Sequence, residues 1–331
     1  FYNNSLKTKI PETFFFFPNP FLLSSLTNSK NFSLKVARTD FQDFWTKDKK
    51  KNQHNSLNNF LWLSLIDRKE DASLIRKIIT LWIKNNFSFN RKVWDNSTAS
   101  LRIISWVLNS DIILNSTNYD FKRNFLQSII MQSNHLKKNF YYENDKVIQV
   151  EILTSIILTG LVFKEYSNNF DFGVKELGKI IPNYFDNNGF PLSRSPNELI
   201  KFLKYFIIIK ECIKDSQRYL PENLELIIKK GLECVKYFTT PENGLALFNG
   251  ATETSLDKFY DYLNHLNIKI KNIKVSVGGI HQLKSKNQKL FVDMGDPPEK
   301  KYSKDYQSGP LSFEYFFDNE KIITNCGFGS G

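Results

Sequence analysis

The chain has 331 residues, 41% of them hydrophobic and 24% charged, which is the composition of a globular protein long enough for two domains. Its 45 Lys and Arg exceed its 34 Asp and Glu, giving a net charge of +11 that favours acidic partners. No zinc-finger, helix-turn-helix or RNP-type motif is present, so a nucleic-acid partner is not expected.

The N-terminal 45 residues predict a packed or extended segment. Residues 14–26 are rich in apolar side chains, but Pro18, Asn19 and Pro20 interrupt them, so no transmembrane segment is expected. The chain begins at Phe1 rather than Met and stops directly after a strand-like run, so we expect a fragment truncated at both ends. A signal peptide would therefore not be visible in this sequence.

Residues 53–265 predict a series of helices. In residues 71–86 the apolar side chains recur at i, i+4, i+7 and i+8, and Ser97 and Thr98 are the expected N-caps of the next helix. Further stripes of this kind lie around residues 101–112, 121–130, 174–181, 199–206 and 224–235. We expect the helix boundaries at four prolines, Pro182, Pro196, Pro221 and Pro241.

The run 146–163 differs from these helices because it leaves almost no polar face, which predicts a helix that is buried on most sides. Alternation of amphipathic and nearly all-apolar helices favours a two-layer (α/α) toroid of helical hairpins. A plain bundle or an α-solenoid would give a similar pattern, although no fixed sequence period indicates a strict repeat array.

After about residue 270 the apolar period changes to two. Leu290 and Val292 alternate with Phe291 and Asp293, and residues 311–325 predict an antiparallel hairpin that turns at Asp318-Asn319. Helices followed by strands indicate a multidomain α-then-β protein. We expect an N-terminal segment over 1–45, an (α/α) toroid over 46–268 and an incomplete antiparallel β-sandwich over 269–331.

Cysteine and histidine usage predicts neither a metal site nor a cofactor. The three cysteines are odd in number and widely spaced, which argues against a disulfide framework and favours buried apolar positions. The four histidines are isolated from one another, so no local metal-binding motif is formed.

Three ordered groups of segments resemble the heparinase II/III-like family, most closely a poorly characterised bacterial branch, over residues 40–331. The first group holds Phe60-Leu61-Trp62-Leu63, Leu81-Trp82-Ile83, Trp94 and Arg102-Ile103-Ile104-Ser105-Trp106. The second holds Asn188-Gly189-Phe190, Ser193-Arg194-Ser195-Pro196 and the run 243–250. The third holds the run 292–298, Leu311-Ser312-Phe313-Glu314 and Thr324-Asn325-Cys326-Gly327.

The resemblance implies an (α/α) toroid with an antiparallel β-sandwich, and polysaccharide lyase chemistry on uronic-acid glycans in the bacterial cell envelope or periplasm. That chemistry neutralises the uronate carboxylate, removes the C5 proton with a base and protonates the departing O4 oxygen with an acid. Asn or Arg suits the first task, and His or Tyr suits the other two.

The family's catalytic positions fall on residues that depart from its pattern. The Asn-His segment of an inner helix falls on Asn144, with Asp145 at the His position and Gln149 at the second Asn. The Tyr after the Arg-Ser-Pro motif falls on Glu198. The His before the Leu-Ser-Phe-Glu strand falls on Gln307, with Tyr306 or Asp305 as neighbouring alternatives.

Five further residues are candidates for substrate binding: Arg194, Tyr142, Arg102, Trp106 and His281. Arg194 could grip a carboxylate bidentately or brace the loop before a helix. Arg102 beside Trp106 could instead be an internal ion-pair partner, because buried charges are usually paired. Tyr141 and Tyr142 could stack on sugars or simply pack. His281 could face a cleft or the surface.

Three functions follow from these residues. The leading hypothesis is β-elimination on an acidic glycan, with Arg194, Asn144 and Gln149 neutralising the carboxylate and Tyr142 or Tyr306 transferring protons. The second is a non-catalytic glycan-binding or cell-envelope protein on the same scaffold. The third is a glycoside hydrolase, for which Asp145 and Glu198 form the available carboxylate pair. The sequence does not indicate an oligomeric state.

Overall fold

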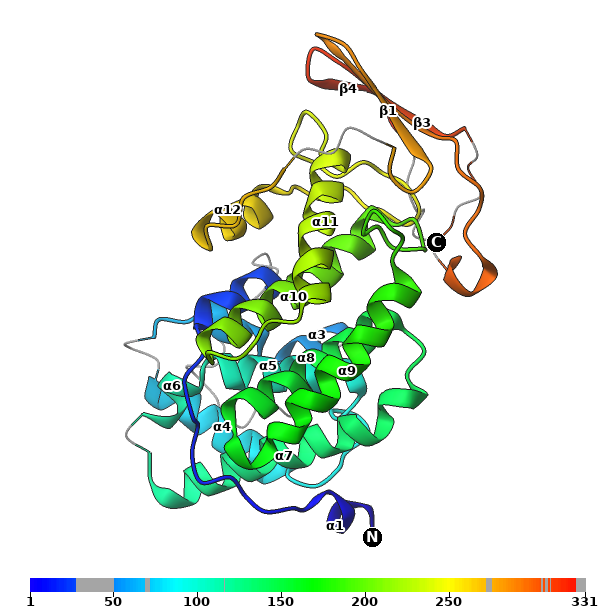
Figure 1. Cartoon of the computed structure of the whole chain (residues 1–331). Helices are drawn as coiled ribbons and strands as arrows, with labels where there is room; N and C mark the ends of the chain where they lie inside the picture. The colour runs from blue at the N-terminus through cyan, green and yellow to red at the C-terminus, as the bar shows by residue number, and fades with distance from the viewer. Residues whose placement is uncertain are drawn as a thin grey trace. The chain divides into compact units, whose positions relative to one another are not determined.

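The computed structural model describes residues 1–27, 51–68, 72–115, 117–271, 276–304, 306, 309 and 311–325. The predicted order, helices followed by antiparallel strands, is confirmed (Figure 1). The chain divides into two compact units, and each is described by itself. Unit 1 comprises residues 1–177 and 208–219, and unit 2 comprises residues 178–207 and 220–331. The predicted domain bounds at residues 45 and 268 remain predictions.

Unit 1 is built from helices in its described residues. They are α1 (Tyr2–Leu6), the 3-10 turns η1 (Pro20–Leu26) and η3 (Leu61–Leu65), α3 (Lys51–Asn58), α4 (Ala72–Asn86), α5 (Asn96–Leu108), α6 (Ser110–Leu114), α7 (Tyr119–Asn139), η4 (Phe140–Tyr142), α8 (Lys146–Val162) and η5 (Lys164–Tyr166). Two longer helices, α9 (Ser167–Tyr184) and α10 (Pro196–Asp215), contribute residues to both units.

The predicted all-apolar helix is α8, which forms the centre of unit 1. Every residue from Gln149 to Val162 is buried, and α8 packs against α5 and α7. Three of its hydroxyls, on Thr154, Ser155 and Thr159, donate to carbonyls of α8 itself, and the Glu151 carboxylate accepts from the Ser97 hydroxyl of α5 at 2.6 Å. Buried polar groups of this kind must be hydrogen-bonded to be tolerated, so the helix can be enclosed on most sides.

Two predicted boundary signals were wrong. Asp95, and not Ser97 or Thr98, caps α5, since its carboxylate accepts from the backbone N–H of Thr98 at 3.0 Å. Pro182 lies inside α9, whereas Pro196 begins α10 and Pro221 is the N-cap of α11. A proline near a helix end is tolerated when the lost backbone bond is compensated by packing, so the boundary at Pro182 could not be read from sequence.

Unit 2 contains the end of α9, the start of α10, two further helices and a sheet. These elements are α11 (Glu222–Phe238), α12 (Asp257–His265), β1 (Ile280–Lys284), β2 (Gln288–Asp293), the 3-10 turn η6 (Lys300–Tyr302), β3 (Phe313–Phe317) and β4 (Glu320–Ile323). The four strands are antiparallel in the order β1-β2-β3-β4. The predicted hairpin is β3 and β4, with Asp318 and Asn319 both at positive φ in its turn.

The sheet has one buried and one partly exposed face. Phe291, Asp293, Glu314 and Phe316 lie on the buried face, each at most 2% exposed. The alternate residues, among them Phe313 at 42% exposed, lie on the other face. The described residues form this single sheet, so they show one layer of the predicted sandwich.

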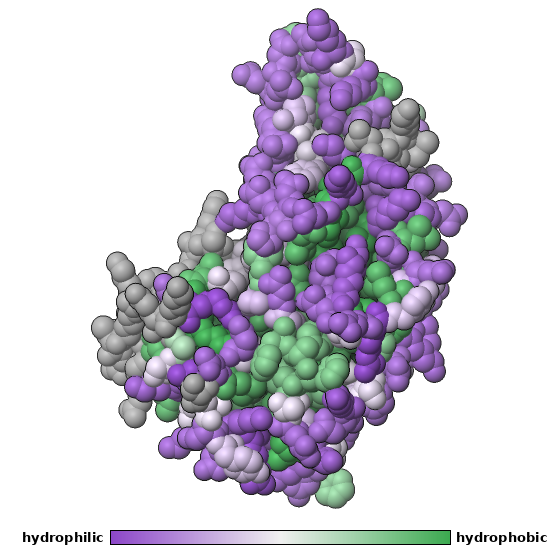
Figure 2. Space-filling view, turned by 60° about the vertical axis from the view of Figure 1, so that its left-hand side comes forward, coloured by the Kyte–Doolittle hydropathy of each residue, from purple (hydrophilic) through white to green (hydrophobic). Residues whose placement is uncertain are grey.

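Among the described residues, no helix is both long enough and apolar enough to cross a membrane. The face drawn in Figure 2 is largely hydrophilic, with hydrophobic patches interspersed. The cysteines Cys212 and Cys234 are buried as expected, and Cys326 lies outside the described residues.

Candidate functional site

The first family-like group of segments forms the core of unit 1. Arg102 is completely buried: its Nε donates to Gln132 at 2.7 Å, and its Nη1 and Nη2 donate to the carbonyls of Asn58 and Val93 at 2.7 and 2.9 Å. Its guanidinium lies 4.2 Å from the ring centre of Trp82. Burial lowers the pKa of Arg102 to about 9.

Arg102 and Trp106 therefore hold the core together, and the expectation that they contact substrate is corrected. Trp106 is 0% exposed and packs against the rings of Phe60, Trp82 and Phe125. The partners of Arg102 are mainly carbonyls, which also differs from the expected internal ion pair. Wrapping a guanidinium in carbonyl acceptors satisfies its donors without a second buried charge.

Polar side chains gather where the loop 143–145 enters α8. Glu143 accepts from the backbone N–H groups of Asn144 and Asp145 at 2.9 and 3.0 Å and from the Asn96 amide at 2.8 Å. Asp145 is the N-cap of α8, since its carboxylate accepts from the N–H groups of Val147 and Ile148. Both carboxylates thus satisfy the unpaired backbone donors at the start of the helix.

Gln149 is buried beneath this loop. Its amide donates to the carbonyl of Glu143 at 2.6 Å, and its side-chain oxygen accepts from the Lys146 ammonium at 2.9 Å. The side chain therefore fixes the loop and positions Lys146. A direct contact between Gln149 and a substrate stays a prediction, because both of its polar atoms are engaged in the structure.

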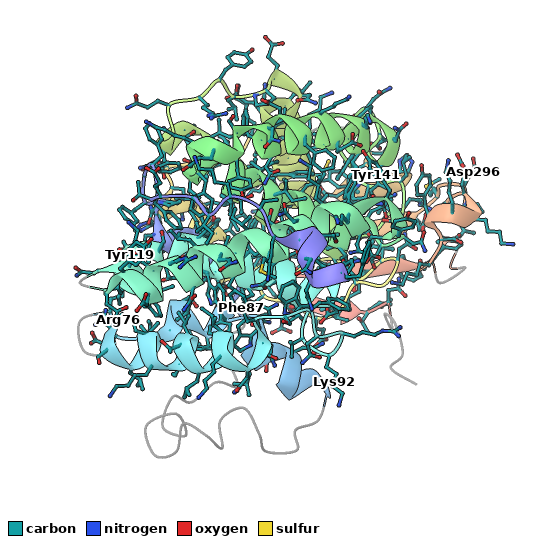
Figure 3. All side chains as sticks on the ribbon, turned by 90° about the horizontal axis from the view of Figure 1, so that it is seen from below. Arg76, Phe87, Lys92, Tyr119, Tyr141 and Asp296 are labelled. Carbon is teal, nitrogen blue, oxygen red and sulfur yellow. The ribbon has the colours of Figure 1, made fainter. Side chains whose placement is uncertain are left out.

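Asn144 and Tyr142 face solvent beside this loop. Asn144 is exposed and Tyr142 is 82% exposed, and neither side chain has a hydrogen-bond partner among the described residues. The neighbouring Tyr141, labelled in Figure 3, is 65% exposed and packs edge-on against Phe140. The start of α8 thus presents an amide and a phenol that a ligand could reach, next to the cationic Lys146.

Lys146 was missed in the sequence. It is half-buried in the first turn of α8, where a cation opposes the helix dipole. A lysine at this unfavourable position, directly after Asn144 and Asp145, was the signal in the sequence that could have identified it as a site residue. We name the group formed by Tyr142, Asn144 and Lys146 the α8 cluster.

In unit 2, the Arg194 side chain connects the second group of segments that carry the resemblance, to which it belongs, with the third group, which includes residues 292–298. Its Nε donates to the carbonyl of Gly278 at 2.6 Å, its Nη1 donates to the carbonyl of Asp296 at 2.9 Å, and its Nη2 forms an ion pair with Asp293. The Asn249 amide donates to the backbone carbonyl of Arg194 at 2.9 Å. Arg194 is 6% exposed, so the structure favours the loop-bracing role over a grip on substrate.

Gly295 explains how Arg194 fits. A Cβ at Gly295 would lie 2.7 Å from Nη2 of Arg194, closer than real side chains allow. The missing side chain lets the chain after β2 approach the guanidinium, so that the carbonyl of Asp296 can accept from it.

Glu198 lies at the start of α10 and belongs to a capping arrangement. The Ser195 hydroxyl accepts from the backbone N–H of Glu198 at 3.4 Å, as in a Ser-x-x-Glu capping box. The Glu198 carboxylate accepts from the Tyr184 hydroxyl at 3.0 and 3.1 Å and from the Ser193 hydroxyl. Sequence reasoning missed Tyr184, because it lies on α9, away from the Arg-Ser-Pro motif.

Unit 2 also contains a hollow of about 260 Å³ beside Arg194. Its acidic lining residues are Asp186, Asp296 and Glu299, and the charge of Arg194 is balanced by Asp293. Burial raises the pKa of Asp186, although backbone N–H groups oppose the shift. A hollow lined in this way repels carboxylates and sulfates, so it does not suit an acidic glycan.

The remaining predicted site residues lie in unit 2. His281 is exposed on β1, opposite Val292 of β2. Tyr306 is half-buried, and its N–H donates to the carbonyl of Ser303 at 3.1 Å. Gln307 and Asp305 lie outside the described residues. Roles of these residues in catalysis or binding stay predictions, as does the pairing of Asp145 in unit 1 with Glu198 in unit 2.

Among the described residues, no group of three or more His, Cys, Asp or Glu side chains could hold a metal ion. The α8 cluster presents groups that can contact an acidic ligand. It offers a hydrogen-bonding amide, a half-buried cation and a phenol hydroxyl at one helix start.

Comparisons with known proteins agree with this architecture. Residues 271–331 match the family described as heparinase II/III-like, C-terminal. A comparison with curated proteins finds no match.

Among solved structures, the chain is similar to a mutant of the heparan sulfate lyase HepC from Pedobacter heparinus, with a TM-score of 0.72 and 15% identity over 100% of this chain and 61% of that one. The HepC structure without that mutation gives a TM-score of 0.67 and 14% identity over 98% and 60%. A crystal structure of heparinase III gives a TM-score of 0.65 and 14% identity over 86% and 52%.

The chain thus spans about 60% of the length of the HepC structures that it matches. At this identity the likeness concerns the fold: a helical part similar to the (α/α) toroid of heparinases, followed by an antiparallel sheet. Residues 271–331 thus match the heparinase II/III-like C-terminal family, and the fold of the whole chain is similar to that of the heparan sulfate lyase HepC.

Proposed function

We propose that this protein is a polysaccharide lyase that cleaves a uronic-acid-containing glycan by β-elimination. The observation that carries the proposal is the α8 cluster, which places the exposed Tyr142 and Asn144 and the half-buried Lys146 at the helix start that the resemblance assigns to the lyase asparagine. The similarity of the whole chain to heparan sulfate lyases supports the same reaction class.

Asn144 and Lys146 would neutralise the uronate carboxylate. The Lys146 ammonium is held by Gln149 at 2.9 Å, and the Asn144 amide is unpaired among the described residues. A cation and an amide donor on a carboxylate stabilise the negative charge that develops when the C5 proton leaves. The carboxylates of Glu143 and Asp145 nearby are turned to the backbone of the loop and of α8, from whose N–H groups they accept.

Tyr142 would carry the proton transfer. In a β-elimination the C5–H and C4–O4 bonds break, a C4=C5 double bond forms, and the proton lost from C5 is matched by one gained at O4. A tyrosine oxygen that takes up the first proton and returns one to O4 serves both steps. Tyr142 is 82% exposed and without a partner among the described residues, so its hydroxyl is available to a substrate.

The test is the appearance of an ultraviolet-absorbing unsaturated product from heparan sulfate, hyaluronan or another uronate polymer. Tyr142→Phe removes only the hydroxyl, so we expect turnover to fall at least roughly 100-fold with little change in glycan affinity. Tyr141→Phe is the matched control, because Tyr141 is also exposed and lies one residue earlier. Equal turnover in both variants and the wild type would exclude Tyr142 as the proton-transfer group.

A second function, binding of an acidic glycan without cleavage, is favoured by one observation. Gln149, Glu198 and Arg194, which occupy or neighbour the family's functional positions, are all engaged by other groups of the protein. Retained affinity for a uronate polymer, together with no unsaturated product from any polymer tested, would select this function over the lyase.

The compartment belongs to the same proposal. Acidic polysaccharides of the kind proposed are extracellular or envelope materials, so we propose a cell-envelope or periplasmic location in a bacterium. Fractionation of the source cells, with the protein detected by antibody, checks this: recovery with the cytosolic fraction alone would contradict it.

A further inference from the structure

Two hollows lie side by side between α4 and α7 in unit 1, away from every residue considered above. Each has a volume of about 510 Å³, within the usual range for ligand sites. They share Thr80 of α4 and Asn118 and Phe121 at the start of α7, so together they form one continuous depression. We name it the α4–α7 groove.

The first hollow is cationic. Arg76 and Lys77 line it, and none of the described residues that line it is a carboxylate. The Nη1 of Arg76 donates to the carbonyls of Ile112 and Asn115 at 3.4 and 3.2 Å, which orients the guanidinium. Its Nε and Nη2 donate to none of the described residues. An oriented guanidinium beside an ammonium is suited to a carboxylate or sulfate group.

The second hollow is aromatic. Phe87 and Phe121 line it, both half-buried, and its two charges, Lys84 and Asp120, have opposite signs. The accessible parts of these half-buried rings offer apolar area to the C–H faces of a sugar ring. The groove thus passes from a cationic end to an aromatic, electrically balanced end.

The cationic hollow next to the aromatic hollow indicates the class of ligand. A small anion would need only the first hollow, and a purely apolar ligand would gain nothing from Arg76 and Lys77. A chain that repeats apolar ring faces and negative groups uses both hollows at once. Acidic polysaccharides have this composition, and the net charge of +11 favours them further.

The α4–α7 groove is separate from the α8 cluster. Phe121 lies near the start of α7, whereas Asn139 ends the helix just before η4 and the loop that leads to Asn144. At about 1.5 Å per residue, the helix from Phe121 to Asn139 is roughly 27 Å long. Figure 3 labels Tyr119 and Tyr141, which flank the two ends of α7, far apart in the view from below.

We propose that the α4–α7 groove is a second binding site for the acidic polysaccharide, which holds a stretch of the chain remote from the α8 cluster. The identity of the ligand rests on the proposed function, whereas the site itself rests on the cations and rings of α4 and α7. Such a site raises the affinity for long chains, because two segments of one molecule bind at once.

The experiment compares two charge reversals in binding to immobilised heparan sulfate chains and to a heparan sulfate tetrasaccharide. K77E/K84E changes the groove at two exposed positions, while R91E/K92E makes the same change in net charge at exposed residues outside its lining. Figure 3 labels Lys92 well apart from Arg76. Equal melting temperatures of the two variants and the wild type check folding.

We expect K77E/K84E to weaken binding of the long chains roughly tenfold relative to R91E/K92E, since two cation contacts are replaced by repulsion. Turnover of the tetrasaccharide should be the same in both variants, because the groove is remote from the α8 cluster. Equal weakening by both variants would show that only net charge matters and would overturn the proposal, as would a wild-type protein that does not bind the chains.

Failure of the lyase proposal has a different signature. Wild-type protein that forms no unsaturated product, while K77E/K84E selectively loses long-chain binding, would reject catalysis and retain the groove. Product formation together with unchanged long-chain affinity in K77E/K84E would reject the groove and retain the lyase.

Discussion

His135, at the scale of single residues, shows how burial fixes the chemical state of a side chain. It is 5% exposed on α7, its Nε2 lies 2.9 Å from the carbonyl of Trp94, and its Nδ1 lies 2.7 Å from the Tyr2 hydroxyl. A carbonyl only accepts, so Nε2 carries the hydrogen and Nδ1 accepts from Tyr2. The neutral ring thereby attaches the N-terminal helix α1 to α7.

Burial lowers the pKa of His135 to about 4, and the hydrogen bond to the carbonyl of Trp94 opposes the shift. An unfolded histidine has its ordinary pKa near 6.5, so the unfolded chain takes up a proton first as the pH falls. The stabilisation given by the neutral ring is fully present above pH 6.5 and is lost progressively as the pH falls toward 4.

We therefore expect the wild type to lose up to about 2 kcal/mol of unfolding free energy between pH 7 and pH 5 through His135. His135→Gln, which cannot titrate, should lack this part of the pH dependence. Urea unfolding of both proteins at the two pH values measures it. Parallel loss in the variant and the wild type would mean that other groups cause the pH effect.

The candidate site was partly predictable at this scale. Asn144 and Tyr142 could be placed near the start of an inner helix, because the apolar run that follows them is unmistakable. The burial of Arg102 and the internal bonding of Gln149 could not be read from sequence. Each depends on carbonyls that distant segments supply, such as those of Asn58 and Val93 for Arg102.

At the scale of elements, the side chain of Arg194 connects the loop before α10 to the segments on either side of β1 and β2. The buried Asp293, 2% exposed at the end of β2, pairs with this guanidinium and also accepts from the N–H of Gly295 at 3.1 Å. An ion pair of this kind contributes most through the cost of leaving one partner alone.

Arg194→Ala should destabilise the protein by about 3–5 kcal/mol, because Asp293 would remain buried without its counter-charge. Adding Asp293→Asn removes that charge, so the double variant should recover part of the loss. Denaturant unfolding of the wild type, both single variants and the double variant measures the coupling. Additive effects of the two substitutions would contradict a direct pair.

The strands could be predicted from the alternation of apolar residues, but the sequence did not show which face of the sheet is buried. In β3 both sets of alternate side chains include aromatics: Phe316 is buried, while Phe313 and Phe317 are 42% and 41% exposed. Glu314 lies on the buried side, where its carboxylate accepts from the N–H of Leu247 at 3.1 Å. Because aromatic residues lie on both faces of β3, hydrophobicity alone does not show which face is buried. The hydrogen bond between Glu314 and the backbone of Leu247 accounts for the burial of that face.

At the scale of the whole molecule, the order of helices and strands followed from the change of apolar period, and the resemblance to the heparinase II/III-like family rests on three ordered groups of residues. Much of what those groups encode is framework: Arg102 and Trp106 hold unit 1 together, and Arg194 with Asn249 and Asp293 holds unit 2 together. The residues that carry the resemblance thus include several that build the fold.

The net charge of +11 leads to a prediction for the whole molecule. Binding of a carboxylated or sulfated polysaccharide should weaken steeply as salt is raised, because the Debye length falls from about 30 Å at 0.01 M to about 10 Å at 0.1 M. A neutral polysaccharide of similar length should show no such dependence. Affinities measured across that range of salt test this, and a salt-independent affinity for the acidic polymer would mean that hydrogen bonds and ring contacts, rather than the basic surface, determine recognition.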